Sequence, residues 1–425
     1  MNSTFRHATG YAWFLFAFIC STYMLIPFHR SSTAVMAVDI MGDLGLNAPE
    51  MGLLASTFFV IFGIMQVFGG VLTDGLGPRR LLPVMVAISG LGAFLFSVSH
   101  SLFPALAARA LMGFGVSTIF LCGLKLIGAW FPPAAFAKMT GILLGVGGMG
   151  AFLASAPLAK SCAVFGWRTV FFVFGVMSVL FALGLRVSIR DTPQGNISSN
   201  NKCTMDWEGL LRNARLVISN RNFWLACLWM FCNFNMNLSF SGLWGAVYLK
   251  DVHHLAQVEI GNVLNMTGLG ILTGGLLAGW LNDTVFKSYT KTMAFTSIVM
   301  TLLFMLLVFA GASLPLWSLY VWFLLNAAFG VPMHSVAFCA MRDTFGPATT
   351  ATACGLLNSL PSMGVLLFQP LTGAILEIFP KTSTGFSPEA HTWGCLFYLA
   401  AGIIGLWAVL SIQPVPQQQS TISET

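Results

Sequence analysis

Long apolar runs separated by short polar segments dominate this chain. Runs of about 20 mostly apolar residues are long enough for a helix to cross a bilayer. Twelve such runs begin near Tyr11, Met51, Leu81, Pro104, Met139, Thr169, Asn222, Val258, Thr292, Leu316, Thr350 and Thr392. The longest polar gap, residues 188–221, divides them into six and six. The pattern predicts an all-α integral membrane protein with twelve transmembrane helices in two six-helix bundles.

The same gap sets the predicted domain organisation. We expect an N-terminal bundle over residues 1–188, a cytoplasmic linker over 189–221, a C-terminal bundle over 222–412 and a disordered polar tail over 413–425. Within the linker, apolar residues from Trp207 to Ile218 recur at helical spacing, with Arg212 and Arg215 on the opposite face. This spacing predicts an amphipathic helix that lies on the inner membrane surface.

Composition excludes several classes of protein. Only 8% of the residues are charged and 56% are hydrophobic, whereas soluble domains carry about 25% charged residues. The net charge of +6 does not indicate nucleic-acid binding, because the basic residues lie between apolar runs. The nine cysteines form no C-x-x-C pair, so neither a disulfide framework nor a zinc site is predicted. With no catalytic motif present, we expect no enzyme activity, no metal and no cofactor.

The distribution of Lys and Arg predicts the orientation in the membrane. With the N-terminus inside, thirteen of the 20 basic residues fall in inner segments and four fall in outer loops. Cytoplasmic loops of membrane proteins carry an excess of Lys and Arg. We therefore expect both termini in the cytoplasm and a multi-pass location in a bacterial inner membrane, with a specialised internal membrane as the alternative.

Two loops at equivalent places in the two halves share a pattern. The first reads GVLTDGLGPRR from Gly70 to Arg80, and the second begins GWLND at Gly279. Gly, Leu and Asp fall at the same spacing in both, and Asp283 follows Asp74 by 209 positions. Such duplication is typical of secondary transporters built from repeats.

With these loops the chain resembles the major facilitator superfamily over essentially its whole length. Gly70–Arg80 is similar to that family's G-x-L-a-D-r-x-G-r-k loop, although two of the basic places are Gly75 and Pro78 here. The segments Arg109–Gly115 and Gly166–Arg168 are similar to two further motifs, on the fourth and sixth helices. The resemblance implies a latch that holds one conformation closed between the second and eleventh helices. Its residues are Gly70, Asp74, Gly77, Arg79, Arg80 and Asp283.

Two arginines, Arg30 and Arg109, lie inside predicted spans with no acidic residue mid-membrane in the first half. An arginine there costs about 2.5–3.5 kcal/mol and therefore needs a partner or a purpose. Two unpaired arginines in a cavity attract an anion. The pattern resembles the anion:cation symporters and, more loosely, the organophosphate antiporters. The symporters usually carry an acidic residue just before the first arginine, and His29 stands at that place in this chain. The alternative for Arg109 is structural, as a cap on backbone carbonyls between helices.

The second half carries amides at helical spacing on three predicted helices. Asn237 precedes Trp244 on the seventh, Asn326 and His334 share a face of the tenth, and Asn358 lies on the eleventh. Amides facing lipid are costly, so these faces are predicted to turn inward. They either line a polar cavity or join helices through hydrogen bonds.

These observations favour a secondary active transporter that moves a small organic anion, a carboxylate or a phosphate ester, by rocker-switch alternating access. The expected substrate-binding residues are Arg30, Arg109, Asn237, Trp244, Asn326, His334 and Asn358. The coupling ion is expected to be H⁺, carried by His29 or His334, and the protein is expected to be a monomer in the lipid bilayer. The alternatives are a carrier for a carboxylate siderophore or other iron chelate, an amino acid carrier, or a transporter-like sensor.

Overall fold

The computed structural model describes residues 10–191, 207–345, 347–382 and 385–413. Within them the chain is helical apart from turns and one isolated antiparallel bridge between Lys381 and Phe386. The N-terminal helices are α1 Gly10–Tyr23, α2 Leu25–Val35, α3 Ala37–Leu44, α4 Ala48–Leu76, α5 Pro78–Ser97, α6 Leu102–Val116, α7 Ile119–Trp130, α8 Pro133–Leu153 and α9 Ala156–Ser188. The C-terminal helices and single turns are α10 Trp207–Ile218, α11 Arg221–Ser239, η1 Phe240–Trp244, α12 Gly245–His253, α13 Gln257–Trp280, η2 Leu281–Phe286, α14 Tyr289–Ala310, η3 Gly311–Ser313, α15 Leu316–Ala328, η4 Val331–Met333, α16 His334–Phe345, α17 Pro347–Ile378 and α18 Pro388–Leu410.

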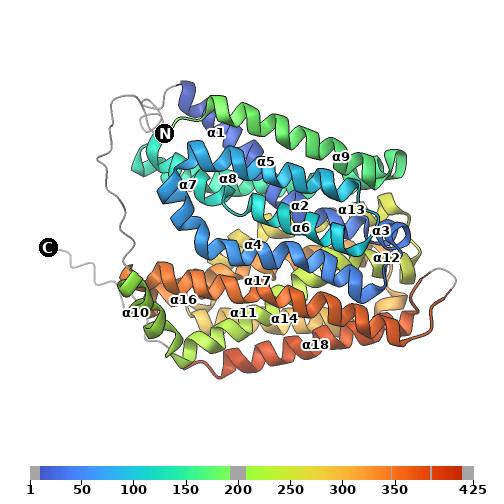
Figure 1. The fold of residues 1–425 in the computed structure, drawn as a ribbon. Helices are drawn as coiled ribbons and strands as arrows, with labels where there is room; N and C mark the ends of the chain where they lie inside the picture. The colour runs from blue at the N-terminus through green and yellow to red at the C-terminus, as the bar shows by residue number, and fades with distance from the viewer. Residues whose placement is uncertain (1–9, 192–206, 346, 383–384, 414–425) are drawn as a thin grey trace.

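The helices form two bundles that follow the order of the chain (Figure 1). In the first half α5 packs against α6 and α9, and in the second half α11 and α14 pack against α18. The halves meet where α4 runs along α17 and where α13 packs against α9 and α8. The prediction of an all-α membrane protein built from two helical halves is confirmed.

In the described part of the chain, ten helices are long and apolar enough to cross a membrane, rather than the twelve expected. One of them, residues 146–188, is a 43-residue stretch that contains a break at Gly166, where φ is 76°. Another expected span, α11, is not among the ten, and it carries three asparagines at 233, 235 and 237. A kink and a polar helix therefore account for the difference.

The two halves are tied together at the end of the molecule that carries α3 and α12, which Figure 1 shows opposite α10. There the Gln257 side chain donates to the Asp39 carboxylate at 2.9 Å, and the Ala48 amide donates to Glu377 at 3.0 Å. Gly52 allows the backbones to touch, since a Cβ there would lie 2.5 Å from the carbonyl carbon of Gln369. This end, called the α3/α12 end below, is closed in this structure.

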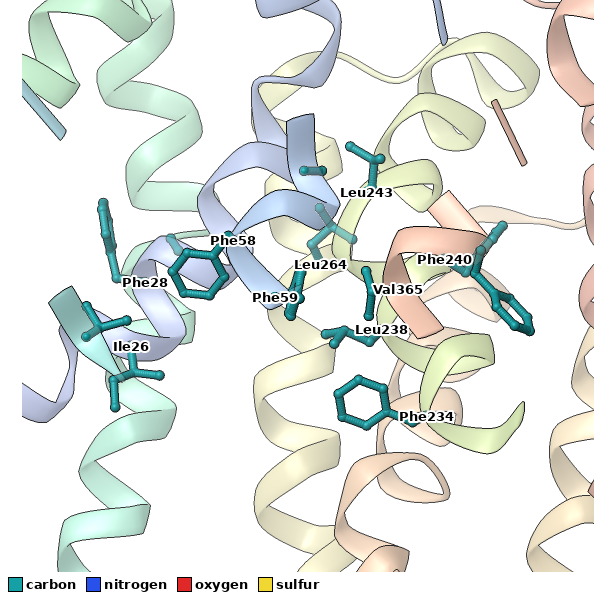
Figure 2. Close-up of a cluster of buried hydrophobic side chains, with 14 of the residues drawn as sticks. Ile26, Phe28, Phe58, Phe59, Phe234, Leu238, Phe240, Leu243, Leu264 and Val365 are labelled. Atoms are coloured by element: carbon teal, nitrogen blue, oxygen red, sulfur yellow. The ribbon is translucent and has the colours of Figure 1, made fainter. Parts of the chain in front are cut away.

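Apolar side chains from both halves fill the middle of the molecule. Figure 2 shows Phe28, Phe58 and Phe59 of the first half together with Leu238 and Leu264 of the second, and all belong to one buried cluster. Polar side chains that share this region lie among apolar neighbours and must find hydrogen bonds within the protein.

The predicted linker contains α10, which occupies the stretch where an amphipathic helix was expected. Its Arg212, Arg215 and Leu216 are exposed, and Val217 is buried. Residues 192–206 of the linker, and the predicted tail from residue 414 onward, lie outside the described residues.

Candidate functional site

Arg30 lies in a cavity between the two halves. The first predicted span is interrupted at Met24, and α2 begins at Leu25 with Pro27 in its first turn, where the missing N–H of proline costs little. Arg30 follows within the next turn. Its Nε is buried and has no hydrogen-bond partner, and no acidic side chain among the described residues forms a salt bridge with it. It is a cation without a counter-ion in the interior.

The cavity draws its polar side chains from both halves. Arg30, Ser31 and Ser155 come from the first half, and Asn237, Ser241 and Thr267 from the second. The space open to the centres of water-sized molecules is about 40 Å³, and one water needs about 10–15 Å³. In this conformation the cavity therefore accommodates a few waters, and a larger solute requires the halves to separate.

The wall opposite Arg30 is organised by amides. Asn237 Nδ2 donates to the backbone carbonyl of Asn326 at 3.0 Å, and Asn326 Nδ2 donates to Ser241 Oγ at 2.8 Å. The Asn326 Oδ1 atom is buried without a partner. Gly330 provides the space for Asn237, because a Cβ there would lie 2.5 Å from Asn237 Cγ. The amides thus hold Ser241 in place at the cavity, whereas Asn326, itself expected to bind substrate, does not line the cavity in this conformation.

A π-helical turn shapes this wall. The turn η1, Phe240–Trp244, separates α11 from α12 and presents Ser241 and Gly242 to the cavity. Trp244 is buried and donates from Nε1 to the backbone carbonyl of Gln369 at 3.0 Å. It joins the π turn to α17 and does not line the cavity, so its expected contact with substrate is not seen in this conformation.

Two further residues expected in the binding site lie elsewhere. His334 is buried, its Nε2 is 3.1 Å from Asn233 Oδ1, and Trp229 and Phe234 pack against its ring. Asn358 is exposed and does not line the cavity. Both belong to helices of the second half, but neither reaches the cavity that contains Arg30.

Arg109 also lies outside the cavity. Its side chain is fully buried, donates to the carbonyl oxygen of His29 at 3.1 Å and to Thr33 Oγ1 at 3.5 Å, and lies over the Phe58 ring. The His29 ring contacts Ser89 Oγ at 3.2 Å. Arg109 therefore fastens α6 to α2 behind the segment that bears Arg30. This geometry matches the structural alternative rather than a pair of arginines gripping one ligand.

In the described part of the chain, the backbone of the loop proposed as a latch contacts the start of the predicted linker. Gly77 adopts a φ of 74° between α4 and α5, and the backbone N–H of Arg79 donates to Asp191 Oδ1 at 2.8 Å. The Arg79 and Arg80 side chains are exposed. The surroundings of Gly70 and the side chain of Asp74 fall outside the described part. In the second copy, Asp283 is exposed in η2 and accepts a hydrogen bond from Asn282 at 2.8 Å.

Sequence reasoning missed several residues that the structure brings to these sites. Thr267 and Ser155 line the cavity, and Asp191 caps the start of α5. The signal available for Thr267 was a polar position within the apolar run of α13. For Asp191 there was none, because its role depends on a contact 112 positions away.

Comparison with known proteins places the chain in one family. The profile described as "Major Facilitator Superfamily" matches residues 19–331 and 259–424. The chain is 27% identical over 289 residues to a probable L-galactonate transporter of Escherichia coli K12, covering 61% of this chain and 58% of that protein. It is 23% identical over 380 residues to a hexuronate transporter of Bacillus subtilis 168, covering 88% and 87%.

Solved structures show the same fold. A bacterial homologue of the human lysosomal transporter Spinster, in an inward-facing and unoccupied conformation, superposes with a TM-score of 0.74 at 17% identity and covers 96% of this chain and 100% of its own. The galactonate relative is matched over less than two thirds of its length, whereas the hexuronate relative is matched over most of it. The family match, which extends over most of the sequence, shows that the chain belongs to the Major Facilitator Superfamily of membrane transporters.

Proposed function

We propose that this protein is a secondary active transporter for a small organic anion, a carboxylate or a phosphate ester, and that Arg30 binds the anionic group. The observation that carries the proposal is the position of Arg30 in the cavity between the halves, with its Nε buried and unpartnered. A partly buried guanidinium whose Nε has neither a hydrogen-bond partner nor a counter-ion among the described residues is unfavourable. An anion bound there would supply the missing charge and the missing acceptor.

The substrates after which the two relatives are named support an anionic substrate, because galactonate and hexuronates are sugar acids. Arginine suits such a ligand, since its planar guanidinium can donate two parallel hydrogen bonds to a carboxylate or phosphate. Iron–carboxylate chelates share the anionic charge and amino acids share the carboxylate, so both belong in the test as competing ligands.

The proposal includes alternating access between the two halves. The hydrogen bonds at the α3/α12 end would break for the cavity to open there, while the cavity stays between the same helices. A coupled proton is assigned to His29 or His334, which are buried and lie next to polar partners within the predicted spans. A transport rate that does not depend on a pH gradient would contradict proton coupling but not the binding of an anion.

The test is the thermal stability of the purified protein with a panel of carboxylates, sugar acids, phosphate esters, amino acids and iron–carboxylate chelates. A ligand at about 100 times its Kd adds about 2.7 kcal/mol to the free energy of unfolding. We expect stabilisation by one class of anion, its loss in Arg30→Gln, and its retention in the control Arg186→Gln, which removes an exposed arginine at the end of α9. Equal stabilisation of the wild type and Arg30→Gln would overturn the proposal.

A further inference from the structure

Thr267 has an unusual environment for a threonine on a spanning helix. A helical threonine commonly donates to the carbonyl oxygen four residues earlier. Several threonines of this protein do so, at distances of 2.7–3.0 Å: Thr22, Thr57, Thr273, Thr296, Thr301 and Thr372. Thr267 does not, and its Oγ1 is buried with no partner while its side chain lines the cavity.

An unsatisfied buried hydroxyl is costly, typically by about 1–3 kcal/mol. The carbonyl oxygen of Val263, four residues before Thr267, is the usual acceptor for such a hydroxyl, yet the Thr267 hydroxyl does not donate to it. Thr273, two turns further along the same helix, makes this local bond to Leu269 at 3.0 Å. The helix therefore permits the local bond, and the hydroxyl of Thr267 is available to whatever occupies the cavity.

Ser241 offers a second hydroxyl on the same wall. Its Oγ accepts a hydrogen bond from Asn326 Nδ2 at 2.8 Å. Because that bond uses an oxygen lone pair, the hydroxyl hydrogen of Ser241 remains free to donate. The cavity thus has a cationic side at Arg30 and a neutral side at Ser241 and Thr267, contributed by different halves.

We propose that Thr267, together with Ser241, selects substrates that carry hydroxyl groups at a distance from the anionic group. This inference rests on the proposed function, since it assumes that Arg30 binds the anion. A hydroxyl both donates and accepts, so it can satisfy Thr267 and Ser241 while the acid is held from the other half. An acid without hydroxyls leaves the Thr267 hydroxyl without a partner and the Ser241 hydroxyl hydrogen without an acceptor, and it loses that part of the binding free energy.

The experiment compares binding of gluconate, glucuronate and glucose 6-phosphate with binding of butyrate, which is charged but carries no hydroxyl. Thr267→Val keeps the shape of the side chain and removes its hydrogen-bonding group, and Thr267→Ser keeps the hydroxyl. Thr273→Val is the matched control, because Thr273 lies on the same helix, is exposed and forms its local bond. Unfolding temperatures without ligand show whether each variant is folded.

We expect Thr267→Val to reduce the preference for the hydroxylated anions over butyrate by about three- to tenfold, the effect of one neutral hydrogen bond. Thr267→Ser and Thr273→Val should keep the wild-type preference. An unchanged preference in Thr267→Val, with binding still lost in Arg30→Gln, would overturn this inference and leave the proposed function intact. If the wild type binds none of these anions, both proposals fall.

Discussion

The carboxylate of Glu377, near the end of α17, accepts a hydrogen bond at 3.0 Å from the backbone N–H of Ala48, the first residue of α4. The two residues are 329 positions apart and belong to different halves. Negative charge at a helix N-terminus is favourable, because the first N–H groups of a helix have no partner within it. Glu377 therefore links the halves through the free N–H of α4.

We expect Glu377→Gln to weaken closure of the α3/α12 end, because a neutral amide binds the helix N-terminus less strongly than a carboxylate. The shift should be about 1–2 kcal/mol in the equilibrium between closed and open conformations. It can be measured by electron double resonance between spin labels on unnatural amino acids at positions 100 and 313, which are exposed at this end in different halves. Lys381→Gln is the control, since it removes the exposed ion pair to Glu377 and the contact of Lys381 with the Phe386 ring but leaves the Glu377 carboxylate in place. Equal distance distributions in Glu377→Gln and wild type would contradict the role of Glu377.

Asp39 adds a dependence on pH to the same end. Partial burial raises the pKa of Asp39 above its ordinary value of about 3.8, while the hydrogen bond from Gln257 and the charge of Lys250 oppose the rise and Asp43 adds to it. A group whose pKa is raised in one conformation binds its proton more tightly there, so acidification favours that conformation. Lowering the pH through the raised pKa should therefore increase the closed population at the α3/α12 end. Asp39→Asn should abolish this dependence in the same distance measurement, and a closed population that falls on acidification would contradict the sign.

The architecture could be predicted because it depends on signals that repeat along the chain. Apolar runs of bilayer length, the gap before Arg221 and the spacing shared by Asp74 and Asp283 all indicated two helical halves. The boundary near Gly166 was expected from the sequence, but α9 continues across the kink there as one helix, so fewer than twelve separate stretches are found in the described residues. Contacts such as Asp39–Gln257 connect residues 218 positions apart at the ends of helices, where no periodicity exists to reveal them.

The candidate site could be predicted only in part for a related reason. Sequence position shows that Arg30 and Arg109 are both inside spans, but not which way each helix turns. Packing decides that, and it directs Arg30 to the cavity and Arg109 to the carbonyl of His29. Thr267 carries no charge, so nothing in its sequence context distinguished it from threonines that bond to their own helix.

The two arginines should respond differently to the same substitution. Arg109→Gln removes a donor from the His29 carbonyl, which keeps its hydrogen bond from Ser32 Oγ, and from Thr33 Oγ1. A buried polar group left without a partner costs about 1–3 kcal/mol, so a lower unfolding temperature is expected. Arg30→Gln removes a buried charge whose Nε has no partner, so the ligand-free protein should unfold at the same temperature or higher. Thermal unfolding of both variants without ligand checks this. If Arg109→Gln unfolds like the wild type yet no longer binds anions, Arg109 is a binding residue instead.

Substitution of Gly330 tests the role of the amides, because Gly330 contacts Asn237 but does not itself line the cavity. A Cβ at this position would lie 2.5 Å from Asn237 Cγ, so Gly330→Ala should displace Asn237 and disturb its bond to the Asn326 carbonyl. Overpacking of this kind costs about 1–3 kcal/mol of stability, and anion affinity should fall with it.

Gly275→Ala is the control, because a Cβ there meets nothing within 4 Å and alanine favours a helix over glycine by about 1 kcal/mol. Parallel measurement of unfolding temperature and anion binding checks both variants. Unchanged binding in Gly330→Ala would show that the position of Asn237 does not matter to the ligand.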